Sequence, residues 1–257
     1  MPDRPGYRVE ACLGSGYYAD VFRVVDLGSG RAYAAKVYTG DPAGVEAAAR
    51  EAEALRALSH RRVPALRETF DQAGWPIVVM ELVPGRNLRA EVAARGPLAL
   101  ARTLELAIEA CELLEHVAAR GWTYRDLHPK NIHPSTPRGV MLLDFDGARP
   151  PGWPARPAGR IGYRAPELDG DGPVSPACDL YSLAGCVHFA LTGDDPTERP
   201  GALPERPGEP SPRPALAELL AACRRPDPTS RPPIASVRSE LERLRDGVRD
   251  GPTGVSE

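Results

Sequence analysis

No apolar run in the sequence approaches the roughly 18 residues that a membrane-spanning helix requires. The opening residues, MPDRPGYRVE, lack the apolar segment of a secretory signal peptide. Charge of either sign is nearly balanced, with a formal net charge of -3 and a pI near 6.0. Without a strong basic excess we expect no nucleic acid and no membrane as a partner. These absences together predict a cytoplasmic protein.

Cysteine is scarce, and its spacing carries no metal or disulfide pattern. The residues Cys12, Cys111, Cys178, Cys186 and Cys223 include no CxxC pair and no Cys/His grouping. An odd number of cysteines also leaves a thiol without a partner. We therefore expect ordinary buried thiols.

Lysine is rarer still. Of 32 basic residues only Lys36 and Lys130 are lysine, so the chain strongly prefers arginine. Lysine carries a compact ammonium on a flexible stem, whereas arginine presents a planar fork. Two lysines that persist against this preference indicate positions where the ammonium itself is needed.

What the chain does contain is centred on residues 124–147, which read YRDLHPKNI, a short hairpin and then LLDFDG. Asp126, Lys130, Asn131 and Asp144 place two carboxylates, an amine and an amide within this stretch. Magnesium prefers oxygen ligands and takes only one or two carboxylates from a protein. The grouping therefore suits a polyphosphate held through magnesium, with a second aspartate free to accept a proton.

The spacing D-x4-N, with a further aspartate thirteen residues after the asparagine, resembles the catalytic and metal-binding loops of protein kinases. This resemblance implies that Asp126 accepts the hydroxyl proton while Asn131 and Asp144 hold Mg2+ beside ATP. His128 stands where serine/threonine kinases usually carry lysine. Lys130 would then neutralise charge on the γ-phosphate, the alternative being a lysine exposed on a loop.

The N-terminal segment YRVEACLGSGYYADVFRVV predicts two strands joined by a glycine turn. Gly14, Ser15, Gly16 and Val21 fit the kinase pattern GxGxxGxV, with Ala19 in place of the third glycine. The loop is therefore expected to cover the phosphates of the nucleotide.

The next strand, RAYAAKVY, carries Ala34 in the expected nucleotide site and Lys36 at the position of the phosphate-binding kinase lysine. A helix is expected over Val45 to Ser59. Its Glu51 resembles the glutamate that pairs with this lysine. Glu53 lies about 200° away round the helix, so both carboxylates cannot face the lysine.

Leu55 and Leu66 are expected as apolar supports behind the site. The strand WPIVVMELVPG resembles the hinge between kinase lobes, which implies that Met80 lies behind the adenine and that residues Glu81 to Val83 bind it. His133 occupies the position where the family usually has a leucine beneath the base.

These features predict an α+β, two-lobe protein-kinase-like fold. The N-lobe, residues 1–83, is small and rich in strands with one helix, and the C-lobe, residues 84–245, is mainly helical. Residues 246–257 are expected to form a flexible tail. A core helix is expected over Leu98 to Arg120, and the last helices over Leu216 to Cys223 and Ile234 to Leu244.

Three later motifs extend the resemblance. GRIGYRAPEL ends with Glu167 and has Arg160 where threonine is usual. CDLYSL supplies Asp179, which would bind the backbone of the catalytic loop, and RRPDPTSRPP supplies Arg231 as the partner of Glu167. Tyr124, which replaces the usual histidine, would pack against Phe145.

Two segments depart from the family. Residues 144–167 contain no serine or threonine and only Tyr163 as a tyrosine, so we expect activity without phosphorylation there. Asp146 replaces the glycine of DFG, and we interpret it as a turn residue, with a metal-facing carboxylate as the alternative. The proline-rich stretch Thr192 to Pro214 excludes a continuous helix and indicates that a substrate-docking helix of the family is lost.

The sequence therefore predicts ATP- and magnesium-dependent transfer of the γ-phosphoryl group to a serine or threonine hydroxyl of a protein or peptide. A small-molecule phosphotransferase of the aminoglycoside or choline kinase type remains open, because DLHPKN also resembles the D-x-H-x-x-N loop of those enzymes. A pseudokinase that regulates another protein is the third possibility.

Overall fold

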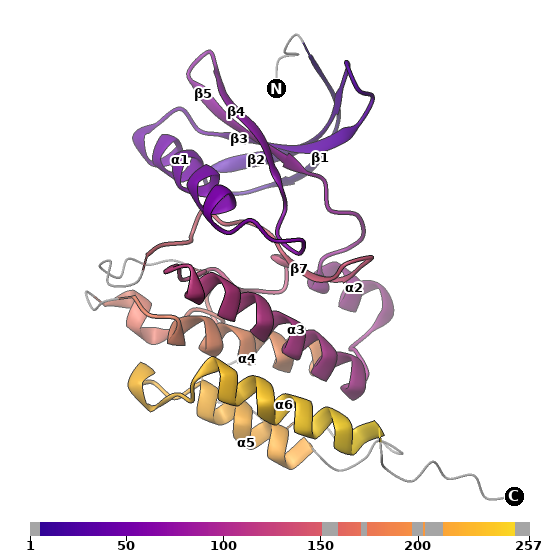
Figure 1. Ribbon diagram of the computed structural model, residues 1–257, viewed down its shortest axis with the longest axis vertical. Helices are drawn as coiled ribbons and strands as arrows, with labels where there is room; N and C mark the ends of the chain where they lie inside the picture. The colour runs from indigo at the N-terminus through magenta and orange to yellow at the C-terminus, as the bar shows by residue number, and fades with distance from the viewer. Residues whose placement is uncertain (1–5, 151–158, 171–173, 197–202, 204–212, 250–257) are drawn as a thin grey trace, which may run out of the picture.

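The computed structural model describes residues 6–150, 159–170, 174–196, 203 and 213–249. These residues form a sheet with one helix across it and, below the sheet, a group of packed helices (Figure 1). The predicted two-lobe α+β fold is confirmed.

The upper lobe is built on a five-stranded antiparallel sheet in the order β1-β2-β3-β5-β4. Ala73 and Gly74 form the turn between the last two strands in sequence, and both have positive φ, as tight hairpin turns require. The strands are β1 (Tyr7–Ser15), β2 (Ala19–Asp26), β3 (Ala32–Tyr38), β4 (Leu66–Gln72) and β5 (Trp75–Glu81).

The direction of the Lys36 side chain follows from its position in strand β3. Successive side chains of a strand face opposite sides, so Lys36 shares a face with Ala34 and Tyr38. Ala34 and Tyr38 belong to the main core, whereas Ala35 belongs to a separate cluster on the other side of the sheet. The ammonium therefore projects from the face that packs on the main core.

Helix α1 (Pro42–Ala57) begins three residues before the predicted start at Val45. The side chain of Asp41 accepts hydrogen bonds from the backbone N–H groups of Ala43 and Gly44, both at 2.9 Å, and so caps the helix earlier. Small alanines line the buried face, and Leu55 is 3% exposed. The predicted support from Leu55 is confirmed, and Leu66 packs partly buried against the same core.

The lower lobe contains mainly helices (Figure 1). Its helices are α2 (Leu88–Arg95), α3 (Leu100–Ala119), α4 (Ala177–Thr192), α5 (Arg213–Cys223) and α6 (Ile234–Arg249), with 3-10 turns η1 (Pro166–Asp169) and η2 (Pro228–Ser230). A hairpin of β6 (Ile132–Thr136) and β7 (Gly139–Leu142) lies between the lobes. Helix α4 is buried on nearly all sides, and α3 packs against both α4 and α6.

One helix of the lower lobe was not predicted, and two predicted helix boundaries change. Helix α2 was not predicted; the side chain of Asn87 caps it, and Gly96 ends it at φ 80°. Helix α5 starts at Arg213 rather than Leu216. Helix α6 runs to Arg249, so the prediction of a tail from residue 246 is wrong for 246–249, because Val248 still packs against the core. Residues 250–257 lie outside the described part.

Of the proline-rich stretch, the structure describes residues 192–196, 203 and 213–214. Helix α4 stops at Thr192, and Gly193 follows with a left-handed φ of 83°, which terminates the helix. Residues 197–202 and 204–212 lie outside the described residues, and so does the predicted loss of a docking helix.

In the described ranges no helix combines the length and apolarity needed to cross a membrane. All five cysteines are free; four are buried as predicted, and Cys12 is exposed.

Candidate active site

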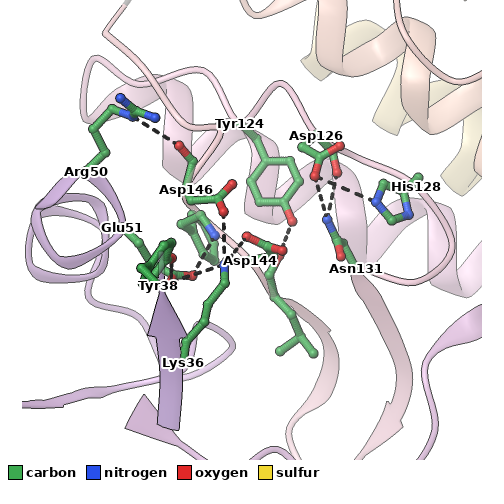
Figure 2. Close-up of polar contacts among 12 residues, drawn as sticks. Lys36, Tyr38, Arg50, Glu51, Tyr124, Asp126, His128, Asn131, Asp144 and Asp146 are labelled. Atoms are coloured by element: carbon green, nitrogen blue, oxygen red, sulfur yellow. Dashed lines mark hydrogen bonds and ion pairs between the residues drawn. The ribbon is translucent and has the colours of Figure 1, made fainter. Parts of the chain in front are cut away.

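Lys36 lies at the centre of a cluster of carboxylates. Its Nζ is 2.7 Å from Asp144 Oδ1, 3.1 Å from Asp146 Oδ2 and 3.3 Å from Glu51 Oε2 (Figure 2). Burial by itself would lower the pKa of Lys36, but Asp144 and Glu51 outweigh it and raise the pKa well above its ordinary value. The ammonium therefore stays charged, as a group that binds phosphate must.

Glu51 contacts three partners, namely Lys36, Tyr38 and the backbone of Phe145. Its side chain is 1% exposed, and it accepts hydrogen bonds from the Tyr38 hydroxyl and from the backbone N–H of Phe145, the latter at 3.2 Å. Helix α1 thus contacts both strand β3 and the Asp144–Gly147 turn through one carboxylate. The predicted pairing of Glu51 with Lys36 is confirmed, and Glu53 is exposed.

Asp144 presents the most open carboxylate of the cluster. Its side chain keeps 34% of its exposure, against 21% for Asp146 and 1% for Glu51. Burial disfavours its ionised form, yet Lys36 outweighs that effect and lowers the pKa of Asp144. Its backbone has φ 60°, an uncommon value for a residue with a side chain. Asp144 therefore combines an ionised carboxylate with partial access to solvent.

Asp126 and Asn131 form a second group beside this cluster. Asn131 Nδ2 donates to the backbone oxygen of Asp126 at 3.0 Å and to its Oδ2 at 3.1 Å. His128 Nε2 lies 3.7 Å from the same Oδ2. Figure 2 shows Tyr124 between this pair and the carboxylates around Lys36. Because Asn131 uses its nitrogen for Asp126, its amide oxygen is the atom suited to bind a metal.

A buried aspartate fixes the backbone of the catalytic loop. Asp179 on α4 accepts from the N–H of Tyr124 at 2.9 Å and from the N–H of Arg125 at 2.7 Å. Burial raises the pKa of Asp179 to about 6, although both hydrogen bonds oppose the rise. Arg125 has φ 73°, so the loop adopts a strained turn that this carboxylate stabilises. The predicted role of Asp179 is confirmed.

Tyr124 itself packs as predicted. Its ring lies 5.0 Å from that of Phe145, edge to face, and its hydroxyl donates to the backbone oxygen of Leu143. Gly147 follows closely, and a Cβ at that position would lie 3.2 Å from the Cβ of Asp126. The close approach of the two loops therefore favours glycine there.

Lys130 is not part of either cluster. It is exposed, and its backbone N–H donates to His128 Nδ1 at 3.2 Å. Its predicted contact with a γ-phosphate remains a prediction.

The expected base-binding residues surround the start of the connection between the lobes. Met80 and Ala34 are 8% and 9% exposed, and they are paired across β3 and β5. Glu81 donates its N–H to Ala65 and pairs its carboxylate with Arg138, so only its carbonyl oxygen remains suited to a base. His133 is buried, which lowers its pKa, while the Pro84 carbonyl opposes this shift.

The other predicted nucleotide contacts are placed by strands β1 and β2. Gly14 and Ser15 end β1, and Gly16 closes the turn by donating its N–H to the Ala19 carbonyl at 2.8 Å. Val21 is partly buried directly opposite Lys36 in the sheet. The predicted strand, glycine turn and strand are confirmed.

Asp146 lies in a turn, as interpreted from the sequence, and its side chain makes a contact that was not predicted. Its φ is not among the positive values in the described chain, so the turn needs no glycine at this position. Its carboxylate binds Lys36, and burial followed by the charge of Asp144 raises its pKa.

Two arginines at this turn were not anticipated. Arg50 Nε donates to the Asp146 carbonyl at 3.3 Å, and Arg149 Nη1 donates to the same oxygen at 3.0 Å. Burial and the nearby Arg50 lower the pKa of Arg149 to about 10. No sequence motif marks these arginines, because they bind backbone oxygen rather than a characteristic side chain.

The later motifs meet as expected. Arg231 has a fully buried side chain and binds Glu167 with two hydrogen bonds, of 2.6 and 2.7 Å. Arg160 is exposed. Tyr163 is 1% exposed, and its hydroxyl donates to Asp195 at 2.6 Å.

The donor set fits a magnesium ion bound together with a polyphosphate. Asp144 and Asn131 offer the carboxylate and amide oxygens that this ion accepts. Nowhere in the described ranges do three or more His, Cys, Asp or Glu side chains form a metal-binding group. Magnesium usually keeps water and phosphate oxygens among its ligands, so two protein ligands are sufficient.

Comparison with known proteins agrees with this geometry. A model of the protein kinase domain matches residues 7–240. A probable serine/threonine-protein kinase PknB of Corynebacterium glutamicum is 32% identical over 75% of this chain and 32% of its own length. A probable serine/threonine-protein kinase PkwA of Thermomonospora curvata is 31% identical over 94% of this chain and 35% of its length. The serine/threonine-protein kinase PknB of Mycobacterium tuberculosis is 31% identical over 74% and 33%.

The chain spans about a third of the length of these curated relatives. The kinase domain match covers most of the chain, including every motif of the site. The chain therefore belongs to the protein kinase family.

Proposed function

We propose that this chain binds ATP with magnesium between its lobes and transfers the γ-phosphoryl group to a serine or threonine hydroxyl of a protein or peptide. The observation that carries the proposal is the convergence of Lys36, Glu51 and Asp144 beside the pair of Asp126 and Asn131 (Figure 2). Lys36, Glu51 and Asp144 come from three separate segments, and Asp126 and Asn131 share a fourth. Phosphoryl transfer needs little covalent chemistry from a protein and depends on positioning and charge.

Lys36 neutralises phosphate charge in this proposal, and Glu51 keeps its ammonium in place. The rigid hold on Glu51 from Tyr38 and Phe145 supports this role, because the lysine then loses little freedom when a ligand binds. A cation in a partly buried cleft also stabilises developing negative charge more strongly than it would in water.

Asp126 orients the acceptor hydroxyl and takes its proton. Asn131 fixes the carboxylate through Nδ2, so the loop holds its base in one orientation. Asn131 and Asp144 hold magnesium, which when bound neutralises charge on the phosphates. Lys130, exposed on the same loop, would add positive charge at the γ-phosphate.

The nucleotide itself would lie against the cleft side of the sheet. Ala34 and Met80 lie there side by side on β3 and β5, and their apolar side chains suit a site for a base. The proposed contacts are the glycine turn with Val21, the hinge and the hairpin, namely Gly14, Ser15, Gly16, Val21, Ala34, Met80, Glu81, Val83 and His133.

The acceptor class rests on two supports. The relatives are named serine/threonine-protein kinases. The buried ion pair of Arg231 with Glu167 braces the segment that follows the catalytic loop, where a peptide would bind. We therefore propose a protein or peptide substrate.

The experiment is transfer of labelled phosphate from ATP to a generic basic protein, with and without magnesium. The wild-type chain should label serine or threonine only when magnesium is present. Asp126→Asn should lower the rate by about 10²- to 10⁴-fold, because the general base is lost. Asp144→Asn should also abolish transfer, since it removes the carboxylate for the metal.

A matched control separates chemistry from binding. Asp126→Asn should still bind Mg·ADP like the wild type, because this aspartate is assigned to the acceptor. Equal transfer by wild type and both variants would refute the proposal. Transfer to an aminoglycoside or choline without any to protein would assign the chain to small-molecule kinases, and no transfer at all would favour a binding module.

A further inference from the structure

The carboxylate of Asp146 forms an ion pair with the Lys36 ammonium, which in the proposed function binds phosphate. It lies 3.1 Å from Lys36 Nζ, while Asp144 lies at 2.7 Å and Glu51 at 3.3 Å. An ammonium has three N–H donors, and three carboxylates face this one (Figure 2). Phosphate oxygens can reach Lys36 only if one of these contacts gives way.

The position of Asp146 is fixed by its backbone. Arg50 of α1 and Arg149 both donate to its carbonyl oxygen, at 3.3 and 3.0 Å. Only 21% of the Asp146 side chain is exposed, so water has little access to its ion pair with Lys36. The carboxylate therefore remains aimed at Lys36 while the backbone stays in place.

The three carboxylates differ in how easily a phosphate would displace them from Lys36. Glu51 is tied to Tyr38 and to the backbone of Phe145, and its side chain is 1% exposed. Asp144 is assigned to the metal and would keep its position when the nucleotide binds. Asp146 lies farther from Lys36 Nζ than Asp144 does, at 3.1 Å against 2.7 Å, and the proposed function gives it no metal to hold. It is the contact that a phosphate displaces most easily.

We propose that Asp146 is a built-in competitor for the phosphate-binding lysine. Its carboxylate holds Lys36 in the nucleotide-free protein and leaves it when phosphate oxygens bind, which weakens nucleotide affinity. This inference rests on the proposed function for the identity of the ligand. The ion pair itself can be measured without any nucleotide.

The first test uses the scarcity of lysine. Limiting reductive methylation with labelled formaldehyde can modify only two side chains, and the exposed Lys130 serves as the internal reference. In nucleotide-free protein, Asp146→Asn should raise the ratio of Lys36 to Lys130 labelling by about tenfold, because a lost charged partner corresponds to about one power of ten. An unchanged ratio would overturn the proposal.

A matched variant controls for general charge. Asp20 is exposed on β2 near the glycine turn, and Asp20→Asn removes the same charge without touching the cluster around Lys36. It should leave the labelling ratio at the wild-type value. An equal rise in Asp20→Asn would show a general field effect and would refute a specific ion pair.

The second test is calorimetric binding of ADP with magnesium and of ADP in excess chelator. Asp146→Asn should bind both forms about three- to tenfold more tightly, the range expected when one competing charged contact is removed. Asp146→Glu should stay near wild type. Weaker binding that appears only with magnesium would make Asp146 a metal-facing residue and overturn the competition.

The two arms separate the inference from the proposed function. If no variant binds ADP but the labelling ratio still rises in Asp146→Asn, the proposed function and the competition both fail while the ion pair stands. If ADP binds every variant with one affinity, the proposed function survives and the competition is refuted.

Discussion

At the scale of single residues, Arg231 shows what a buried ion pair does in this chain. Its side chain has no exposure, and it makes two hydrogen bonds to Glu167 and three more to the carbonyls of Arg225, Pro226 and Ala177. A planar guanidinium meets this set because its donors form a fixed fork. Loss of the arginine leaves a carboxylate and three carbonyls without these hydrogen bonds.

We therefore expect Arg231→Ala to lower the free energy of unfolding by about 3 to 5 kcal/mol, the usual cost of breaking a buried pair. Arg231→Lys should recover only part of it, because lysine cannot form the fork. Urea denaturation measures both changes. Arg243→Ala is the control, since its pair with Glu240 lies on the surface, where solvent screens the charges and an ion pair contributes little. Equal losses at the two sites would contradict this reasoning.

The same scale shows where sequence reasoning about single residues succeeds. Lys36, Glu51 and Asp144 were identified because each stands in a motif of fixed spacing. Asp146 was correctly expected in a turn, but its contact with Lys36 was missed, because local sequence does not show a partner 110 positions away. Tyr38 was missed for the same reason.

At the scale of elements, helix α1 is fastened to the metal-binding turn by two consecutive residues. Glu51 accepts the N–H of Phe145, and Arg50 donates to the carbonyl of Asp146. The helix is therefore held toward the cleft by contacts that involve no phosphate. In the segment that follows, residues 144–167 offer no serine or threonine, and Tyr163 is buried.

Removal of phosphate should accordingly leave the rate unchanged. Chain produced in cells and treated with a broad-specificity phosphatase should transfer phosphate to its substrate at the rate of mock-treated chain, once the phosphatase is removed. The initial rate at saturating ATP is the measurement. A large fall after treatment that rephosphorylation restores would contradict the prediction and place a controlling phosphate elsewhere in the chain.

At the scale of the whole molecule, the connection between α1 and β4 joins the sheet lobe to helix α3. Arg62 binds Glu109 and Glu112 of that helix, at 3.2 and 2.5 Å. Beside it the rings of His60 and His116 lie 4.5 Å apart. The two lobes are thus fastened at a point remote from the cleft, by both ion pairs and imidazoles.

Both imidazoles are suited to the neutral form. His116 Nδ1 faces the Arg120 guanidinium at 2.8 Å, and its Nε2 contacts the Leu58 carbonyl at 3.2 Å. Burial, helped by nearby Arg120 and Arg62, lowers the pKa of His116, although the Leu58 carbonyl opposes this. Burial lowers the pKa of His60, and the positive charges of His116 and of nearby arginines lower it further.

A lowered pKa in the folded state means that the unfolded chain takes up protons first as the pH falls. The contribution of the pair is therefore fully present above the ordinary histidine pKa of about 6.5 and is lost below it. In urea titrations, acidification from pH 7.5 to pH 5.5 should therefore be less favourable for the free energy of unfolding of the wild type than for that of the double variant His60→Gln/His116→Gln. The raised pKa values of Asp146 and Asp179 act in the opposite direction, but both proteins share them. Parallel curves for the two proteins would rule out this pair as the cause.

The sequence by itself determined the family, the two-lobe fold and the order of the motifs, because these depend on local spacing and on strand and helix periodicity. It also determined the partners of Asp179 and Arg231 through the resemblance to kinases. Helix ends were less well predicted, since caps such as Asp41 and packing at Val248 shift them.

Only the tertiary structure decided how the charges around Lys36 are shared. Three carboxylates from two distant segments converge on one ammonium, and two arginines hold the turn that carries Asp146. Such contacts depend on the position of side chains in space after folding, and in a partly buried site their strength depends on which neighbours exclude water. Local sequence contains neither quantity, so the competition at Lys36 became visible only in the folded chain.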